Sequence, residues 1–170
     1  MKKIFALGLA LAMTLGLMAG CSSEKDPASS TPVSGESVNV NLEEFYQTIF
    51  TDPENTPAMV PMDEEMLEGF YPGLTAVERK QTVAYMPMMT AVACEIVMVE
   101  CANKTDVDTV KGIFQARIDS QVDNHFNYPA VIEAWEKESK VVVNGNYVAL
   151  FVVSGMVDEV VGNFNAAFKG

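Results

Sequence analysis

Two charged residues lie among apolar neighbours, and their chemistry depends on what they contact. Glu95 is the one charge inside the run Val92 to Val99, and Arg117 lies between Phe114 and Ile118 on the apolar stripe of a helical segment. A buried carboxylate without a partner is protonated or costs several kcal/mol. We therefore predict a structural ion pair between Glu95 and Arg117, bidentate if the geometry allows. The alternatives are a general base or ligand-binding acid at Glu95, or an exposed Glu95 at the start of its strand.

Other side chains capable of catalysis have simpler explanations. Asp63, Glu64, Glu65 and Glu68 would do acid–base work or bind calcium only if they converged in a cleft, and helix N-termini attract acids anyway. The only histidine, His125, lies in a polar loop, where a histidine triad or a zinc site would lack its other members. The sequence contains no P-loop, nucleophile elbow, dinucleotide fingerprint or EF-hand loop. We therefore expect no cofactor, no metal site and no catalytic residue of the commonest classes.

Six methionines between Met59 and Met89 are a further candidate site, because thioethers bind copper(I). Met62 and Met66 belong to an amphipathic helical stripe, however. Alternate residues from Met86 to Met89 would face opposite sides of a strand. These methionines are expected to fill the core or to line an adaptable groove.

Cys21 has the most specific chemistry in the chain. A short basic start and an apolar run from Ile4 to Leu17 are typical of a secretory signal. The run is shorter than the roughly 20 apolar residues of a transmembrane helix. The junction Leu17-Met18-Ala19-Gly20-Cys21 resembles the lipobox of bacterial lipoproteins, in which the cysteine thiol takes up a diacylglyceryl group. We expect cleavage before Cys21, with ordinary secretory cleavage beside a chance cysteine as the alternative.

These features divide the chain into three parts. Residues 1–20 are the predicted lipoprotein signal peptide, and residues 21–40 are the lipidated cysteine and a tether expected to be disordered, because it is polar and lacks a sustained apolar period. The coil span of that tether is roughly 25 Å. Residues 41–170 have the length of one domain, and we expect them to form a single domain. Two acyl chains on Cys21 would make membrane attachment stable, since one chain alone gives only reversible binding.

The net charge of the chain restricts its partners. The sequence has 11 basic and 23 acidic residues, and removal of residues 1–20 leaves nine basic against 23 acidic, a net charge of −14. Such a surface repels nucleic acid and anionic lipid.

Cys94 and Cys101 are seven residues apart in one predicted strand, roughly 23 Å in extended chain, which is too far for a disulfide. We expect two free thiols, unless the strand breaks between them.

The spacing of apolar residues predicts alternating helices and strands. A helix from Leu42 to about Phe50, with Asn41 at its cap, is followed by a short helix that starts after Asp63 and stops at Pro72-Gly73. Further elements, in order, are strands Thr82 to Met89 and Val92 to Glu100, a helix Thr105 to Val122 with Thr105 and Asp108 at its cap, a short helix from Pro129, strands Lys140 to Val143 and Tyr147 to Ser154, and a final helix with the stripe Val157, Val160, Val161, Phe164 and Phe168.

The predicted fold class is α+β. Pro87 favours an edge position for the first strand, and Asn144-Gly145 predicts a type I′ hairpin turn between the last two. We expect a four-stranded, mainly antiparallel sheet made from two ββα units, with the helices packed on one face and extra N-terminal helices. A mixed sheet in which the first strand pairs elsewhere is the alternative.

Five segments of the chain carry a resemblance to a known family: Val83-Ala84-Tyr85-Met86-Pro87-Met88-Met89, Cys94-Glu95-Ile96-Val97, Phe114-Gln115-Ala116-Arg117-Ile118, Tyr128-Pro129 and Asn144-Gly145-Asn146-Tyr147-Val148. They resemble the DUF4358 family, uncharacterised lipoproteins of low-GC Gram-positive bacteria. The resemblance extends from about Leu42 to Phe168 and implies lipidation, a single domain and a cell envelope with one membrane. It implies no reaction, cofactor or catalytic residue.

Together these features predict a non-enzymatic lipoprotein domain, anchored by lipid on Cys21 to the extracytoplasmic face of the cell membrane. The domain would bind an unknown protein, peptide or small ligand there, or would support assembly of the cell envelope. The alternative is an enzyme with an unrecognised carboxylate-based site. A deep pocket with two or more inward acids would favour the enzyme, and a shallow apolar groove rimmed by acids would favour the binding module.

Overall fold

A five-stranded antiparallel sheet lies at the centre of the structure, a computed structural model that describes residues 38–52, 54 and 56–169. The strands run in the order β1-β2-β3-β5-β4 across the sheet. Cys21 and the predicted signal peptide lie outside the described residues. The strands are β1 (Met59–Pro61), β2 (Arg79–Pro87), β3 (Cys94–Cys101), β4 (Ser139–Asn144) and β5 (Tyr147–Val153).

The prediction of four strands is wrong, because β1 adds a fifth. Val60 of β1 lies opposite Met86 of β2, so β2 is an interior strand and not the edge that Pro87 suggested. Pro87 is tolerated because it is the last residue of β2. β1 has only three residues and ends in Pro61, which leaves too little alternation to be recognised. Every pairing is antiparallel, so the alternative of a mixed sheet is also wrong.

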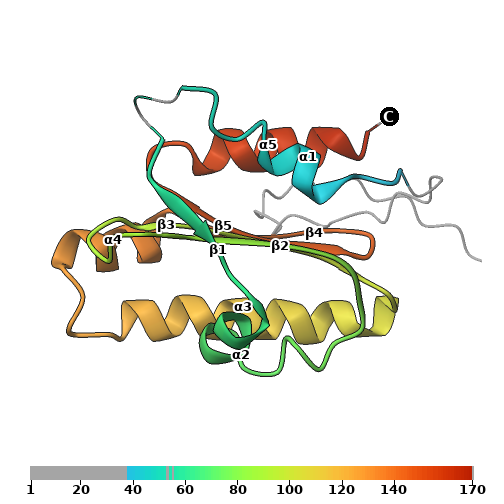
Figure 1. The fold of residues 1–170 in the computed structure, drawn as a ribbon, viewed down its shortest axis with the longest axis horizontal. Helices are drawn as coiled ribbons and strands as arrows, with labels where there is room; N and C mark the ends of the chain where they lie inside the picture. The colour runs from blue at the N-terminus through green and yellow to red at the C-terminus, as the bar shows by residue number, and fades with distance from the viewer. Residues whose placement is uncertain (1–37, 53, 55, 170) are drawn as a thin grey trace, which may run out of the picture. The chain divides into compact units, whose positions relative to one another are not determined.

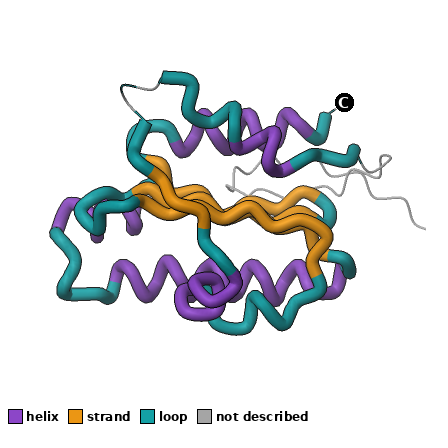
Figure 2. The backbone as a smooth tube through the Cα atoms, in the orientation of Figure 1, coloured by secondary structure: helices purple, strands orange, loops and turns teal. Residues whose placement is uncertain are grey.

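Helices cover both faces of the sheet, whereas the sequence predicted one face only (Figures 1 and 2). One face carries α2 (Glu64–Phe70), α3 (Val107–Val122) and α4 (Pro129–Lys137), and the other carries α1 (Leu42–Tyr46) and α5 (Val157–Ala167).

The physical reason is that β3 and β5 are apolar on both sides. Val97 and Val99 of β3 pack into the core with Phe114 of α3. Ile96 and Met98 point the other way and belong to a second core with α1 and α5. Every residue of β3 and of β5 is buried, so both faces need a cover of helices.

Local sequence signals explain where three of the described helices begin. Asn41 and Asp63 accept backbone N–H bonds in the first turns of α1 and α2, and Pro129 is the first residue of α4. The predicted cap of α3 by Thr105 and Asp108 is wrong. A 3₁₀ turn, η1 (Lys104–Asp106), leads into α3 instead, and no side chain caps the helix.

The turn between β4 and β5 lies one residue later than predicted. Asn144 pairs with Tyr147, which leaves Gly145 and Asn146 as the two central residues. Gly145 has a φ of 60°, the left-handed region that glycine adopts without strain. The hairpin therefore depends on this glycine at the first central position.

The first described residues are tied to the sheet. Tyr147 Oη donates to Asn39 Oδ1 at 2.9 Å and accepts from the backbone N–H of Val40 at 3.3 Å. Gln81 Nε2 donates to the carbonyl of Val40 at 3.0 Å and to Glu100 at 2.7 Å. Asn39 and Val40, which the sequence assigns to the tether, thus contact the folded unit.

Candidate functional site

Glu95 and Arg117 meet on the α3 side of the sheet. Nε of Arg117 donates to Oε1 of Glu95 at 2.9 Å, and Nη2 donates to Oε2 at 2.8 Å, so the contact is bidentate. The two side chains are only 3% and 9% exposed respectively. The structure therefore pairs the two charges for which the sequence predicted a contact, and Glu95 is not an exposed residue at the start of its strand.

Tyr71 is a third member of this buried network, which the sequence did not predict. Its side chain is fully buried directly after α2, and its hydroxyl donates to Oε1 of Glu95. Burial, and then the charge of Glu95, raise the pKa of Tyr71 well above its ordinary value. The tyrosine consequently stays protonated at neutral pH and keeps its hydrogen bond to the carboxylate.

Arg117 is also surrounded by three aromatic rings, two from the end of α2 and one from α4. Its Cζ lies 4.9 Å from the ring centroid of Phe70, 5.4 Å from that of Trp135 and 5.7 Å from that of Tyr71. Burial acts to lower the pKa of Arg117, but the hydrogen bonds and the charge of Glu95 outweigh it and raise that pKa. The charged arginine thereby ties α2, α3, α4 and β3 to one another.

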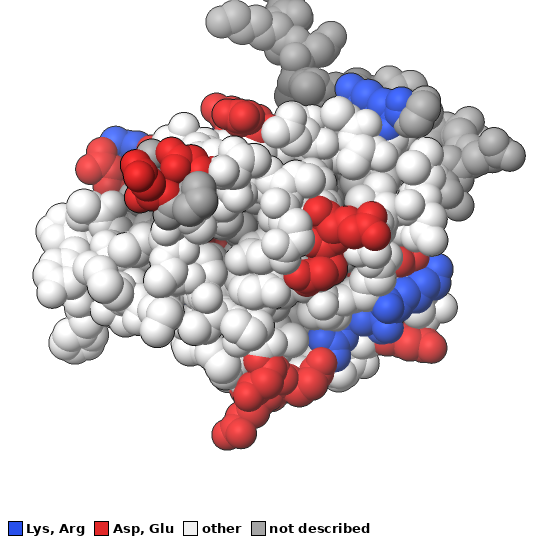
Figure 3. Space-filling view, turned by 45° about the horizontal axis from the view of Figure 1, so that its top comes forward, with Lys and Arg blue, Asp and Glu red and all other residues white. Residues whose placement is uncertain are grey.

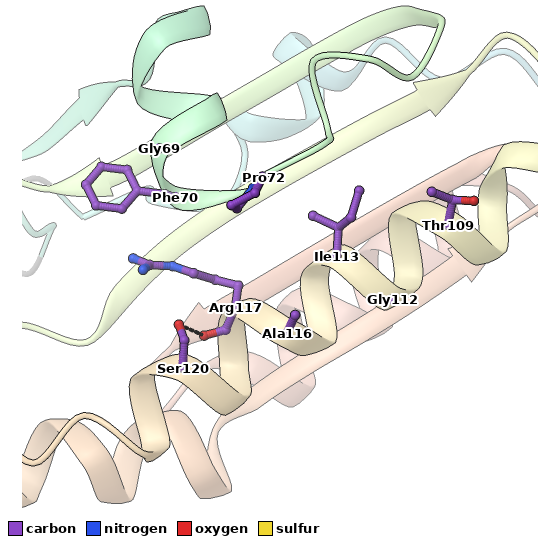
Figure 4. A pocket seen from close by; sticks show the side chains of 9 residues that line it. All are labelled: Gly69, Phe70, Pro72, Thr109, Gly112, Ile113, Ala116, Arg117 and Ser120. Atoms are coloured by element: carbon purple, nitrogen blue, oxygen red, sulfur yellow. Dashed lines mark hydrogen bonds between the residues drawn. The ribbon is translucent and has the colours of Figure 1, made fainter.

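A groove of about 540 Å³ lies beside the network, between α3 and the end of α2 (Figure 4). Phe70 and Pro72 face Ile113 of α3 across it, and the guanidinium of Arg117 points toward Phe70. No carboxylate is among the residues that line it: Gly69, Phe70, Pro72, Thr109, Gly112, Ile113, Ala116, Arg117 and Ser120.

Small residues on α3 keep this groove open. Gly112, Ala116 and Ser120 recur every four residues, which places them on one face of the helix. A Cβ atom added at Gly112 or at Gly69 would meet nothing within 4 Å. The space above these two glycines is therefore accessible to a ligand.

The sequence predicts that Phe70 points inward, because it belongs with Met62, Met66 and Leu67 to the apolar stripe of its helix. The side chain of Phe70 is 36% exposed instead and lines the groove. The groove itself was not predicted, although the four-residue repeat of small residues along an amphipathic helix is a sequence signal for it.

The remaining candidate residues are not brought together. Cys94 and Cys101 are both buried free thiols, as predicted. Burial, and then Glu95, raise the pKa of Cys94 to about 12, which leaves almost no thiolate to act as a nucleophile at neutral pH. His125 is exposed in the loop after α3.

The acidic cluster of α2 is used locally. Asp63 caps the helix, Glu64 pairs with Arg79 at 2.8 Å, and Glu68 accepts hydrogen bonds from Thr75 and Gly73. Among the described residues, no three His, Cys, Asp or Glu side chains are grouped so that they could hold a metal ion. Met62 belongs to the core, whereas Met88 and Met89 are exposed.

None of the helices that the structure describes is long and apolar enough to span a bilayer.

No curated protein and no solved structure matches the chain. One family model does match, over residues 52–153, and its description is "Domain of unknown function (DUF4358)". The match covers all five strands, the Glu95–Arg117–Tyr71 network and every residue that lines the groove. The chain therefore belongs to the DUF4358 family of domains of unknown function.

Proposed function

We propose that the protein is a non-enzymatic binding module, held by lipid on Cys21 at the extracytoplasmic face of the cell membrane. A partner from the cell envelope occupies the groove between α2 and α3. The lipobox-like junction Leu17 to Cys21 supports the anchor, and the groove supports the binding function.

The observation that carries the proposal is an accessible apolar groove whose only charged lining residue, Arg117, is already paired with a buried acid. Glu95 accepts hydrogen bonds from Tyr71 and two from Arg117, and its side chain is only 3% exposed. A general base must reach the proton that it removes. Glu95 therefore holds the groove in shape and does not act on a substrate.

Exposed acids border the groove. Glu65 precedes Gly69 by four residues and Asp108 precedes Gly112 by four, while Asp119 follows Ala116 by three. Residues three or four apart on a helix are surface neighbours, so each acid adjoins a residue of the groove. An apolar groove rimmed by acids is the arrangement expected of a binding module, in contrast to the deep acid-lined pocket expected of an enzyme.

The wider surface is acidic as well. Acidic side chains outnumber basic ones on the face seen in Figure 3, in line with 23 acidic and 11 basic residues in the chain. Long-range attraction therefore favours cationic partners over nucleic acid or anionic lipid.

Photo-crosslinking in intact cells tests the proposal. A photoreactive phenylalanine analogue at Thr109, an exposed residue of the groove, should yield a covalent adduct with a partner. The same analogue at Asn163, an exposed residue of α5 on the other face, is the matched control. Adducts from Asn163 but none from Thr109 would contradict the assignment of the groove.

A further inference from the structure

The groove has the length of a short extended peptide. Its residues on α3 run from Thr109 to Ser120, eleven steps of about 1.5 Å, or about 16 Å. An extended chain rises about 3.3 Å per residue, so about five residues would cover this length.

The surface along this length is apolar and closely approachable. Gly112 and Ala116 present no side chain beyond a methyl group, so a ligand can lie directly against α3. Ile113 and the partly exposed Phe70 offer apolar contact between them. An apolar side chain in the middle of the ligand would be buried here.

The one charged residue among those that line the groove is Arg117. Its Nε and Nη2 donate to Glu95, which offsets the positive charge of the guanidinium. The groove lining therefore has little net charge of its own and suits a neutral, apolar segment of a ligand.

The charges around the groove favour basic groups on either side of that apolar centre. Glu65 on α2 and Asp119 on α3 are exposed and border it. Asp108 lies 3.6 Å from Nζ of Lys111, but both side chains are at least half exposed, so this pair is strongly screened by solvent. Attraction by these acids falls with added salt.

From these four observations we infer that the groove binds an extended peptide of about five residues, with an apolar side chain at its centre and basic residues on both sides. The inference rests on the proposed binding function and names the ligand of the same groove.

The test uses the full chain in detergent micelles with ¹³C-labelled isoleucine δ1 methyl groups. The probes are two acetylated, amidated pentapeptides, one with the order lysine, alanine, phenylalanine, alanine, lysine, and one with glutamate in place of lysine. Ile113 reports on the groove, and Ile49 and Ile96 in the opposite core are internal references. The lysine peptide should shift the Ile113 methyl signal and bind at least about tenfold more tightly than the glutamate peptide, a factor equivalent to 1.4 kcal/mol.

Two matched variants separate occupation of the groove from a change in folding. Gly112→Leu fills open space in the groove, whereas Gly162→Leu fills open space on α5. The first should abolish the shift of the Ile113 signal by the lysine peptide, and the second should leave it unchanged. Equal binding to both variants overturns the inference.

The outcomes also distinguish this inference from the function on which it rests. Adducts at Thr109 in cells, with no shift of the Ile113 signal by either pentapeptide, overturn the ligand class and leave the binding function standing. If neither adducts at Thr109 nor a shift of the Ile113 signal is observed, both the binding function and the ligand class are overturned. If the Ile113 methyl signal shifts with protein concentration alone, a second copy of the chain occupies the groove. That result also overturns the inference that the ligand is a peptide.

Discussion

At the scale of single residues, the Glu95–Arg117 pair makes folding conditional on both partners. Moving two charges out of water costs several kcal/mol for each ion. The bidentate contact, the hydroxyl of Tyr71 and the rings around the guanidinium offset this cost. Loss of one partner leaves the other buried and uncompensated. Replacing one residue of the pair should therefore lower the free energy of unfolding far more than replacing both.

A double-mutant cycle measures this dependence. Glu95→Gln and Arg117→Met should each lower the free energy of unfolding by about 3–5 kcal/mol, and the double mutant should lose much less than the sum. Urea denaturation gives the four values. The exposed pair Glu133–Lys137, with side chains 64% and 65% exposed, is the control and should give a far smaller coupling. Additive losses at Glu95 and Arg117 would mean that the two charges do not stabilise each other.

The sequence indicated this pair but not the rest of the site. Glu95 and Arg117 were conspicuous because Glu95 is the one charge in its apolar run and Arg117 is the charge nearest the apolar stripe of α3. Tyr71 is neutral and follows the last residue of α2, where periodicity no longer says which side chain turns inward. Tyr71 is buried, whereas Phe70, which the apolar stripe of the helix predicted to point inward, lines the groove.

The buried thiol of Cys94 should make the protein less stable at alkaline pH. Burial, and then Glu95, raise its pKa from 9.0 to about 12 in the folded state. Below pH 9 the thiol is neutral in both states and contributes nothing. Between pH 9 and 12 only the unfolded chain loses the proton, so the free energy of unfolding falls by up to about 1.4 kcal/mol per pH unit.

Denaturation at several pH values between 8 and about 10.5, in the wild type and in Cys94→Ala, checks this dependence. The variant should have a shallower fall from pH 9, while the raised pKa values of Tyr71 and Tyr46 continue to lower stability above pH 10 in both proteins. Parallel curves would show that Cys94 does not titrate differently on folding.

At the scale of the helices and strands, sequence patterns predicted the elements whose own residues determine their structure. The continuous apolar runs of β3 and β5 and the stripe of α3 identified these elements to within about two residues of their ends. β1 is a strand only because β2 pairs with it, and the start of α3 depends on a 3₁₀ turn with no side-chain cap. Neither feature leaves a periodic signal.

The β4–β5 turn provides a test at this scale. Gly145→Val forces a β-branched side chain to a φ of 60° and should lower the free energy of unfolding by more than about 1 kcal/mol. Gly162→Val in α5, where an added Cβ meets nothing within 4 Å, should be close to neutral. Chemical denaturation compares them. An unchanged midpoint for Gly145→Val would show that the turn does not require glycine.

At the scale of the whole domain, the two ββα units repeat in order but not in space. β3 and β5 are antiparallel neighbours, so a two-fold axis relating them would be normal to the sheet and would leave both following helices on one face. α3 and α5 lie on opposite faces instead (Figure 1). Because both strands are apolar on either side, the sequence does not indicate which face each helix covers.

The proposed anchor is tested on the entire protein. Cys21→Ser should move the protein from the membrane fraction to the soluble fraction and abolish incorporation of labelled palmitate, because residue 21 then has no thiol to acylate. Cys101→Ser is the control, since this buried cysteine lies within the folded unit and should leave the label unchanged. Undiminished lipid label in Cys21→Ser would sink the proposal of a lipid anchor.

The central pairing of β3 with β5 also has a consequence for the order in which the chain folds. Glu95 lies opposite Val152, so this contact joins residues 57 positions apart in sequence. During synthesis β3 must wait for β5 with one edge unpaired, and the face that α5 later covers stays partly open until α5 follows. Contacts of such separation form slowly, since closing the intervening loop costs entropy before pairing offsets it. The nascent chain is consequently most prone to aggregation in this interval, and a holding chaperone would act on β3.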